Sequence, residues 1–338
     1  MNDTVDLPAV AGGERTVLFV VYDGVQLMDL AGPADAFASA ARLADTRYQV
    51  RLASTGGGDV RTSCGVRISV DVDIADITGP LDTLMVAGGL SRRQALLDHE
   101  LVKHVRRLSQ EARRVGSMCT GAFVLAEGGL LDGHIVTTHW RFRDELATAY
   151  PAVTVLDDAL FVQDPPIVTA AGVTAGVDVA LSLIEQDHGT ELTRQVAQWL
   201  VMFVQRPGGC SQFSVWQRTG AVRNEALRLL LSDIAAYPAA DYTVPAMAAR
   251  LSTSSRHFTR VFSREVGLSP GKYVERARVE AACTLLEATA EGLDVIARRS
   301  GFGTAETMRR AFVRQLGTPP SARRQRGVRL MATDRTAE

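Results

Sequence analysis

The sequence has 338 residues, which exceeds the usual size of one hydrophobic core, so we expect two domains. With 46% hydrophobic and 22% charged residues, the composition excludes an intrinsically disordered chain, and no apolar run is long enough to span a bilayer as a helix. The net charge of −1 hides an asymmetry that predicts a polyanion partner for the C-terminal part, because residues 223–338 carry 19 basic and 12 acidic side chains, against 18 and 26 in residues 1–222.

The chain begins with residues 1–14, which have the composition of a flexible tail. They lack the basic stretch followed by an apolar stretch that marks a secretory signal, so we expect a cytoplasmic protein that does not bind membranes. The four cysteines are far apart and form no CxxC pair, which predicts neither a zinc site nor a disulfide framework. They are Cys64, Cys119, Cys210 and Cys283. No glycine-rich nucleotide-binding motif is found, so no cofactor is expected.

Residues 15–205 alternate short apolar runs with helical patterns. The runs have the length and β-branched content of buried strands, and they are 16–22, 48–55, 81–89, 113–119, 134–140 and 165–172. Helical spacing of apolar residues follows Gly32 and Ser91 and recurs in the stretch VTAGVDVALSLIEQDHG. This alternation predicts βαβ units, a mainly parallel sheet and helices on both faces of that sheet.

Residues 206–222 are predicted to be a linker, because Pro, Gly and Ser interrupt the helical pattern there. From residue 223 to residue 326 the pattern is helical only, and residues 327–338 are expected to form a second flexible tail. Two stretches, 244–270 and 293–320, repeat the same order of short helix, turn, longer helix, Gly and Pro. Two copies are too few for a solenoid, so they predict two tandem helix-turn-helix units.

The second helix of each unit buries its apolar residues on one face and leaves polar residues outward. The outward residues are Arg256, His257, Thr259, Arg260 and Ser263 in the first unit and Thr304, Ala305, Glu306, Arg309 and Arg310 in the second. Such a helix fits the major groove of double-stranded DNA, where Arg pairs with guanine and Glu accepts from cytosine. One basic helix alone is more often a solvated face than a DNA-binding one, but two matching copies favour DNA binding.

Residues 224–326 resemble the AraC-type DNA-binding domain over the stretches SSRHFTRVFSREVGLSPGKYVERARVEAACTLL and VIARRSGFGTAETMRRAFVRQLGTPPSARRQR. The resemblance implies an all-α domain with two helix-turn-helix motifs held by a long connecting helix. It implies that the base-reading residues are Arg256, Thr259, Arg260, Ala305, Glu306, Arg309 and Arg310. Thr307 and Met308 replace the more usual pair of that family, a departure that concerns packing more than base reading.

The stretch GSMCTGAF places Cys119 between an expected strand and an expected helix. A turn of this type exposes the nucleophile in α/β enzymes, and a helix N-terminus is expected to lower the pKa of the thiol. Asp29, Gly88 and Gly89 follow other strands at the same edge of the sheet, so a carboxylate and backbone donors are expected near the thiol. His139 is a candidate base, although a lone His on an apolar strand is more often a core residue.

Residues 16–200 resemble the DJ-1/PfpI superfamily over DGVQLMDLAGP, MVAGG, CTGAFVLAEGGLLDGHIVTTHW and TAAGVTAGVDVALSLI. The resemblance implies a flavodoxin-like α/β sandwich with Cys119 as the reactive thiol, Asp29 as its acidic partner and Thr120 as the next pocket residue. The same stretches are similar to GlxA-type transcriptional regulators, in which this domain is fused to an AraC-type domain, and to isocyanide hydratases. Protease members of the superfamily carry a His directly after the cysteine, where this chain has Thr120, so proteolysis is not expected.

Together these features predict a cytoplasmic transcriptional regulator that is not an enzyme. Its first domain is expected to sense a small, polar, nitrogen-containing or amide-like metabolite, its second domain to bind promoter DNA, and the whole chain to form a homodimer. The expected pocket residues are Asp29, Gly88, Gly89, Cys119, Thr120 and His139. Two alternatives stay open. One is a hydratase-like or amidase-like enzyme that uses Cys119, with the helical domain as an accessory, and the other is an inert scaffold.

Overall fold

A computed structural model divides the chain into two compact units, Met1–Gly209 and Cys210–Glu338. The residues that it describes are 15–44, 46, 48–156, 158–202, 206, 208, 212, 222, 224–289, 291–316 and 319–321. The expected tails, 1–14 and 327–338, and most of the expected linker 206–222 lie outside the described residues. Within the described ranges, no helix is long and apolar enough to cross a membrane, and no group of three or more His, Cys, Asp or Glu side chains is arranged to hold a metal ion.

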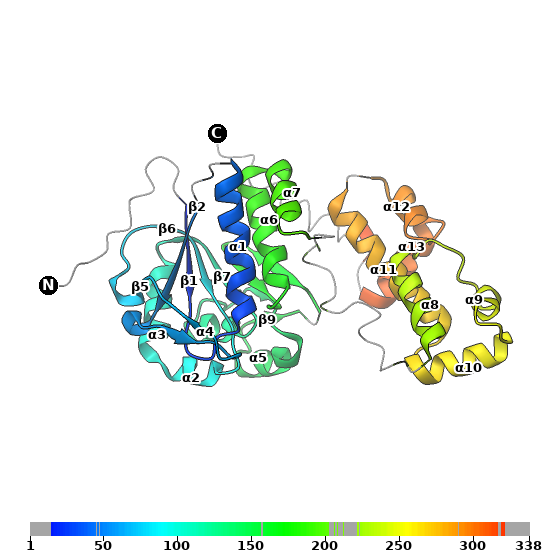
Figure 1. Ribbon diagram of the computed structural model, residues 1–338, viewed down its shortest axis with the longest axis horizontal. Coiled ribbons are helices and arrows are strands. Elements are labelled where there is room, and N and C mark those ends of the chain that lie inside the picture. The colour runs from blue at the N-terminus through cyan, green and yellow to red at the C-terminus, as the bar shows by residue number, and fades with distance from the viewer. Residues whose placement is uncertain are drawn as a thin grey trace. The chain divides into compact units, whose positions relative to one another are not determined.

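The first unit is built on a seven-stranded sheet with the order β10-β11-β7-β6-β1-β2-β5 (Figure 1). Its strands are β1 (Arg15–Val20), β2 (Tyr48–Ser54), β5 (Val72–Asp73), β6 (Leu81–Val86), β7 (Ala112–Met118), β10 (Phe161–Asp164) and β11 (Ile167–Ala170). Neighbouring strands are parallel except β10 and β11, which form an antiparallel pair at one side. The carboxyl ends of the parallel strands therefore meet at one edge, which we call the carboxyl edge, and their amino ends meet at the opposite amino edge.

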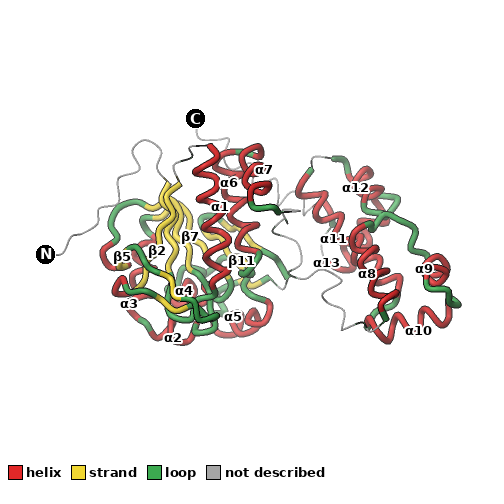
Figure 2. The backbone as a smooth tube through the Cα atoms, in the orientation of Figure 1, coloured by secondary structure: helices red, strands yellow, loops and turns green. Residues whose placement is uncertain are grey.

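Helices cover both faces of this sheet (Figure 2). One face packs against α1 (Leu27–Ala44), α6 (Ala175–His188) and α7 (Thr190–Trp199), and the other against α2 (Arg92–Leu97), α3 (His99–Ser109) and α4 (Gly121–Glu127). Successive side chains of β1 enter opposite cores, with Phe19 on the α1 side and Leu18 on the α3 side, as strand geometry requires. The mainly parallel α/β sandwich expected from the sequence is confirmed.

One expected strand is wrong. Within 134–140 only Ile135–Val136 forms a strand, β8, and it pairs with β9 (Thr154–Val155) outside the main sheet. The next residue, Thr137, is buried and donates its hydroxyl to the carbonyl of Ala159 at 2.9 Å, so a side chain supplies a bond that a strand ladder would otherwise make. This unit also contains the hairpin β3 (Val60–Arg61) and β4 (Arg67–Ile68), the helix α5 (Arg143–Ala149) and three short 3-10 helices, η1 (Thr55–Gly57), η2 (Ile74–Asp76) and η3 (Trp140–Phe142).

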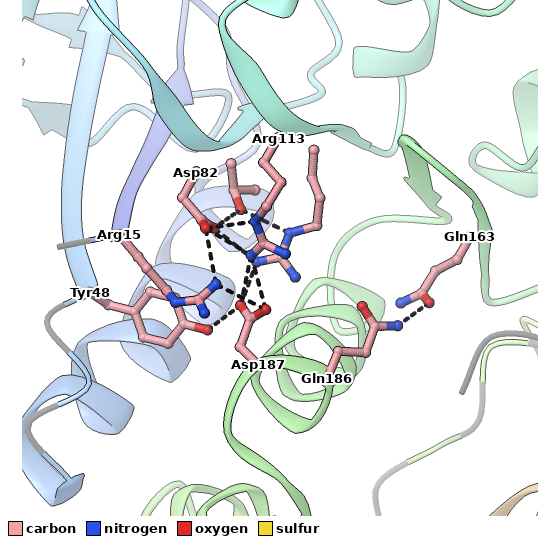
Figure 3. Close-up of polar contacts among 9 residues, drawn as sticks. Arg15, Tyr48, Asp82, Arg113, Gln163, Gln186 and Asp187 are labelled. Carbon is pink, nitrogen blue, oxygen red and sulfur yellow. Dashed lines mark hydrogen bonds and ion pairs between the residues drawn. The ribbon is translucent and has the colours of Figure 1, made fainter. Parts of the chain in front are cut away.

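A cluster of charged side chains joins the amino ends of the strands (Figure 3). This amino-edge cluster consists of Arg15, Tyr48, Asp82, Arg113, Arg114 and Asp187. Arg114 Nη2 lies 3.0 Å from Asp82 and 2.7 Å from Asp187, whose side chains are 5% and 4% exposed. The Tyr48 hydroxyl donates to Asp187 at 2.6 Å. The cluster thus ties β1, β2, β6 and β7 to the end of α6 by mutually compensating charges.

The second unit is helical (Figure 1). Its helices are α8 (Glu225–Ala236), α9 (Val244–Arg250), α10 (Ser255–Val266), α11 (Pro270–Ala288), α12 (Leu293–Arg299) and α13 (Ala305–Leu316). Asn224, Thr243, Ser254 and Ser269 each cap a helix by accepting a backbone N–H in its first turn. Helix α10 ends at Gly267, whose left-handed φ of 75° suits glycine.

The second unit has two hydrophobic cores, one for each helix-turn-helix pair. Phe258 and Phe262 of α10 belong to the first core, and Met308 and Phe312 of α13 belong to the second. Helix α11 contributes its first half to one core and its second half to the other, so it connects the two pairs. The tandem helix-turn-helix architecture expected from the internal repeat is confirmed.

Candidate functional sites

Cys119 lies on a tight turn at the carboxyl edge, between the end of β7 and the start of α4. Its backbone has a left-handed φ of 52°, which is uncommon for a residue with a side chain, and the residue is only 7% exposed. The Cys119 N–H donates to the carbonyl of Ala170 at 2.9 Å, and its carbonyl accepts from the Thr138 hydroxyl at 2.7 Å. A Cβ atom on Gly172 would come within 2.3 Å of the Cys119 Cβ, so the turn is packed against backbone.

Asp29, in the first turn of α1, is fully buried beside Cys119. Its carboxylate accepts the N–H of Gly88 at 3.1 Å and the N–H of Val173. The Cys119 thiol lies close enough to this carboxyl group for each to shift the pKa of the other. Burial raises the pKa of Asp29 to about 6, although the N–H groups of Val173 and Gly88 and the nearby thiol act in the opposite direction. The structure therefore brings together the cysteine and the carboxylate that the sequence predicted as a pair.

The electrostatics of the Cys119 thiol differ from the sequence expectation. The helix N-terminus was expected to lower its pKa, but burial, followed by the nearby Asp29 carboxylate, raises the pKa of Cys119 well above its usual range. The backbone and hydroxyl of Thr120 act in the opposite direction without compensating. The expectation was wrong because the sequence does not show how far water is excluded. Cys119 is a thiol, not a thiolate, in this conformation.

The predicted backbone donors Gly88 and Gly89 lie at the site but are already engaged. The Gly88 N–H donates to Asp29, and the Gly89 N–H donates to the Thr120 hydroxyl at 2.8 Å. Thr120 in turn donates to the Gly89 carbonyl at 2.9 Å. A Cβ atom on Gly88 would come within 2.7 Å of the Cys119 Cβ, which explains why glycine is found there. Neither N–H is free to form an oxyanion hole in this conformation.

His139 is the one predicted pocket residue that the structure does not join to the others. It is half-buried, its Nδ1 accepts the Arg141 N–H at 3.3 Å, and its ring lies beside Trp140 and Phe142. Burial, and then the charge of Arg141, lower the pKa of His139. Among the described residues no hydrogen bond links it to the thiol, so it does not act as the base of Cys119 in this arrangement.

Tyr22 was not predicted and lies at the same site. It lies two residues after the end of β1, so the rule that selected Asp29 and Gly88 would also have selected it. Tyr22 is 8% exposed and its hydroxyl is fully buried near Thr120 and Cys119, yet this hydroxyl forms no hydrogen bond of acceptable geometry with any described residue. Burial is the main cause that raises the pKa of Tyr22. A buried, unpaired donor next to a carboxylic acid suits a polar ligand.

The predicted reading face of the first helix-turn-helix unit lies on α10. Arg256 and Arg260 are exposed, and Thr259 is half-buried with its hydroxyl donating to the Ser255 carbonyl at 2.8 Å. Arg260 Nη2 contacts His257 Nδ1 at 3.2 Å. Among the described residues, neither arginine has an acidic partner. Their charges are therefore available to an external anion.

The corresponding face of α13 differs, because it contains its own acid. Glu306 contacts Arg309 Nε at 2.8 Å and Arg310 Nε at 3.3 Å, and all three side chains are exposed. Ala305, the first residue of the helix, is half-exposed. Arg314, farther along, pairs with Glu275 of α11 and is thereby separated from this group. The two units present the predicted residues outward, but with different charge balances.

Two family models match the chain. Residues 15–186 match the DJ-1/PfpI family, and residues 247–326 match a helix-turn-helix domain. The HTH-type transcriptional regulator CdhR of Pseudomonas aeruginosa is 29% identical over 90% of this chain and 89% of its own. The HTH-type transcriptional regulator GlxA of Rhizobium meliloti is 29% identical over 91% of this chain and 95% of its own. The resemblance to GlxA-type regulators predicted from the motifs is confirmed.

The match to an enzyme is partial. The isonitrile hydratase of Pseudomonas putida is 34% identical, but the match covers 56% of this chain and 78% of the hydratase. A crystal structure of a ThiJ/PfpI family protein from Pseudomonas syringae superposes with a TM-score of 0.53 at 24% identity, covering 68% of this chain and 93% of that one, which shows the fold alone. The chain therefore belongs to the DJ-1/PfpI family and combines that domain with an AraC-type helix-turn-helix domain.

Proposed function

We propose that this protein is a sequence-specific, DNA-binding transcriptional regulator whose DJ-1/PfpI domain senses a small metabolite. The observation that carries the proposal is that one chain combines a buried Cys119–Asp29 site with two outward-facing basic helices, α10 and α13. Both CdhR and GlxA, which are named as transcriptional regulators, match this chain over about nine-tenths of its length. A regulator uses both parts, whereas turnover at the cysteine needs no DNA-reading helix.

We assign base and phosphate contacts to the outward residues of α10 and α13. These are Arg256, Thr259, Arg260, Ala305, Glu306, Arg309 and Arg310. The unpaired arginines of α10 supply phosphate contacts and guanine contacts, which gives affinity. On α13, Glu306 accepts a hydrogen bond from a cytosine amino group. Where the DNA offers no such donor, its negative charge weakens binding. Affinity therefore comes mainly from the first unit and base discrimination mainly from the second.

The ligand site is formed by Asp29, Cys119, Thr120 and Tyr22. It offers donors in the Tyr22 hydroxyl and the Cys119 thiol, and an acceptor in Asp29 once the Val173 bond is displaced. A ligand that can both accept and donate, such as a small amide or another polar nitrogen compound, matches this set. The ligand acts on DNA binding only if it favours one of two conformations.

Several features argue against nucleophilic catalysis as the main role. Acyl or hydration chemistry at a cysteine needs a thiolate or a base, together with donors for the developing oxyanion. Here the pKa of Cys119 is raised, His139 is not joined to it, and the N–H groups of Gly88 and Gly89 are engaged. These observations support sensing over turnover.

We further propose that the protein is cytoplasmic and works as a homodimer. Closed two-fold assemblies are the commonest oligomers, and paired DNA sites suit a protein with two-fold symmetry. Light scattering of the full chain, with and without duplex DNA, measures the assembly directly. A monomer under both conditions would contradict the homodimer.

The DNA-binding proposal is tested with the double variant Arg260→Ala/Arg310→Ala. Duplexes selected from a random pool by the wild-type chain supply the probe, and fluorescence anisotropy gives Kd over a range of salt concentrations. We expect the double variant to lose at least about 100-fold in affinity, because it removes one cation from each reading helix. The control Arg93→Ala/Arg194→Ala removes the same charge from exposed positions of the first unit and should change Kd less than about twofold. Retained specific binding in the first variant would refute the assignment.

The proposal that α10 mainly supplies affinity and α13 mainly supplies base discrimination is tested with Glu306→Gln. Removing the carboxylate frees Arg309 and Arg310 for phosphates, so we expect tighter binding to unrelated duplexes and a steeper dependence of log Kd on log salt. Discrimination between the selected duplex and unrelated DNA should fall about tenfold. Glu191→Gln, which removes the same charge from an exposed intrahelical pair on α7, is the matched control. Unchanged discrimination would show that Glu306 reads no base.

The enzyme alternative is tested with Cys119→Ala. If the protein is a hydratase or amidase, the wild-type chain consumes a simple isocyanide or amide and the variant does not. If it is a regulator, the wild-type chain shows no such turnover, and the variant binds the selected duplex as the wild type does.

A further inference from the structure

The loop of residues 170–174, which we call the site loop, forms one wall of the Cys119–Asp29 site. Ala170 accepts the Cys119 N–H at 2.9 Å, and Gly172 packs directly on the Cys119 Cβ. Val173 donates its N–H to Asp29 Oδ1. Any change in what Asp29 binds therefore acts on this loop.

The same loop is attached to Arg206, three residues before the first unit ends at Gly209. Arg206 donates its backbone N–H to Asp178 Oδ1 at 2.7 Å, and its Nε and Nη2 to Asp178 Oδ2 at 3.1 and 2.6 Å. Its Nη2 also donates to the Thr174 hydroxyl at 2.9 Å. The Asp178 side chain is fully buried on α6, and Arg206 is its ion-pair partner among the described residues. We call these bonds of Arg206 to Asp178 and Thr174 the Arg206 clamp. Both carboxylate oxygens of Asp178 accept a hydrogen bond from Arg206.

A second connection runs through Leu160. The carbonyl of Leu160 accepts the N–H of Ala171 in the site loop at 2.8 Å, and the N–H of Leu160 donates to the carbonyl of Gly208 at 2.8 Å. The segment that leads out of the first unit is thus bonded at Arg206 and at Gly208. Arg206 bonds directly to Thr174 of the site loop, and Gly208 is connected to the loop through Leu160.

The conformation of the site loop depends on the hydrogen bond that Val173 donates to Asp29. Its φ of 54° is left-handed, which is unfavourable for a β-branched residue and persists only where surrounding contacts hold it. The bond to Asp29 is such a contact. A ligand that donates to Asp29 competes with the Val173 N–H, and the loop then relaxes toward an ordinary backbone conformation. Thr174, the next residue, carries that change to Arg206.

We propose that Arg206 is a positioning residue that couples the Cys119–Asp29 site to the chain segment leading to the DNA-binding unit. The clamp is closed while Asp29 holds Val173, and it loosens when a ligand takes Asp29. This inference rests on the proposed function, because it names the route by which the sensor domain reports. Coupling is reciprocal, so opening the clamp must also loosen the site loop.

Hydrogen exchange of the full chain tests the coupling from Asp29 to Arg206. In Asp29→Ala, the Val173 amide loses its acceptor, and we expect the amides of Arg206 and Leu160 to exchange at least about tenfold faster than in the wild type. The central amides of β1 report whether the variant remains folded. The control Glu191→Gln should leave all these rates unchanged. Full protection of Arg206 and Leu160 in Asp29→Ala would overturn the proposal.

Coupling from the clamp back to the site loop is tested with Arg206→Gln/Asp178→Asn. This double variant opens the clamp without leaving a buried carboxylate unpaired. We expect faster exchange at Val173 by at least about fivefold. We also expect that Asp29→Ala changes the Kd of the selected duplex in the wild-type background and not in the clamp-free background. An equal change in both backgrounds, or none in either, would overturn the coupling. Failure of the proposed function is distinguishable, because it appears as absent specific DNA binding in the wild type.

Discussion

The two edges of the sheet in the first unit contain similar buried side chains, a carboxylate and a tyrosine, with different partners. At the amino edge, Asp187 is bonded by arginines and by the Tyr48 hydroxyl. At the carboxyl edge, Asp29 has backbone donors but no cation among the described residues, and the Tyr22 hydroxyl is unpaired. The Asp187 and Asp29 side chains are similarly buried, as are Tyr48 and Tyr22, so the difference lies in their partners.

The difference teaches where stability and function are located in this fold. A buried charge that is fully paired contributes to a rigid structure, whereas a buried polar group without a partner costs free energy and remains available to a ligand. The amino edge therefore joins the strands to α6, and the carboxyl edge is where we propose that a ligand binds.

The largest expected effect comes from breaking the amino-edge cluster with Asp187→Ala. This leaves the buried Arg114 with one carboxylate fewer, and we expect the free energy of unfolding to fall by about 3–5 kcal/mol. Urea denaturation of the full chain measures it. Glu191→Ala, which breaks an exposed pair on α7, should leave the free energy of unfolding nearly unchanged. A loss below about 1 kcal/mol for Asp187→Ala would show that the cluster does not stabilise the sheet.

Next in size is Gly172→Ala, at the carboxyl edge. Gly172 and Gly65 share a φ of 90°, but a Cβ on Gly172 meets Cys119 at 2.3 Å whereas a Cβ on Gly65 meets open space. We expect Gly172→Ala to cost about 2–4 kcal/mol and Gly65→Ala about 1–2 kcal/mol, the second reporting backbone strain alone. Thermal and urea unfolding of both variants give the comparison. Equal costs would mean that the Cys119 turn is not tightly packed.

The pH dependence of stability tests the state of Asp29 at the carboxyl edge. The pKa of Asp29 is raised to about 6 in the folded chain, so the folded state binds its proton more tightly than the unfolded state does, and stability falls as pH rises from about 4 through about 6. Asp29→Asn removes this loss. The stability of the variant relative to the wild type should therefore increase by about 2–3 kcal/mol between pH 4 and pH 7.5. Parallel stability curves would contradict a raised pKa.

The smallest effects come from two matched tyrosines. Tyr48→Phe removes a hydrogen bond to a carboxylate and should lower the free energy of unfolding by about 1–2 kcal/mol. Tyr22→Phe removes a buried hydroxyl that has no partner and should raise it by up to about 1 kcal/mol. Urea titrations under identical conditions measure both. Destabilisation by Tyr22→Phe would indicate that its hydroxyl is already paired, by water for example.

Features that depend on local spacing could be predicted from the sequence. The alternation of apolar runs and helices predicted the parallel sheet, and the position of Asp29 and Gly88 after strands predicted that they would meet Cys119. The internal repeat predicted both helix-turn-helix units, including the outward placement of Arg260 and Arg310.

Features that depend on burial or on distant pairing could not be predicted. The pKa of Cys119 rises because water is excluded, which a motif does not reveal. Asp178 and Arg206 are far apart in the chain and their clamp follows from the path of the chain after α7. His139 was misplaced because an apolar run containing two threonines was interpreted as a strand, whereas Thr137 and Thr138 bond through their side chains.

The connecting helix α11 also sets a length and a rotational phase. Its 19 residues extend about 28 Å, which is slightly less than one turn of B-form DNA, and each end is fixed in the core of one helix-turn-helix pair. Helices do not stretch, so α11 fixes the separation of the two surfaces that we propose read DNA. Inserting one alanine at its middle would advance the second surface by about 1.5 Å but rotate it by about 100°. If both surfaces read DNA as proposed, such a protein would still bind either half of its site, though not both halves from the same side of the duplex.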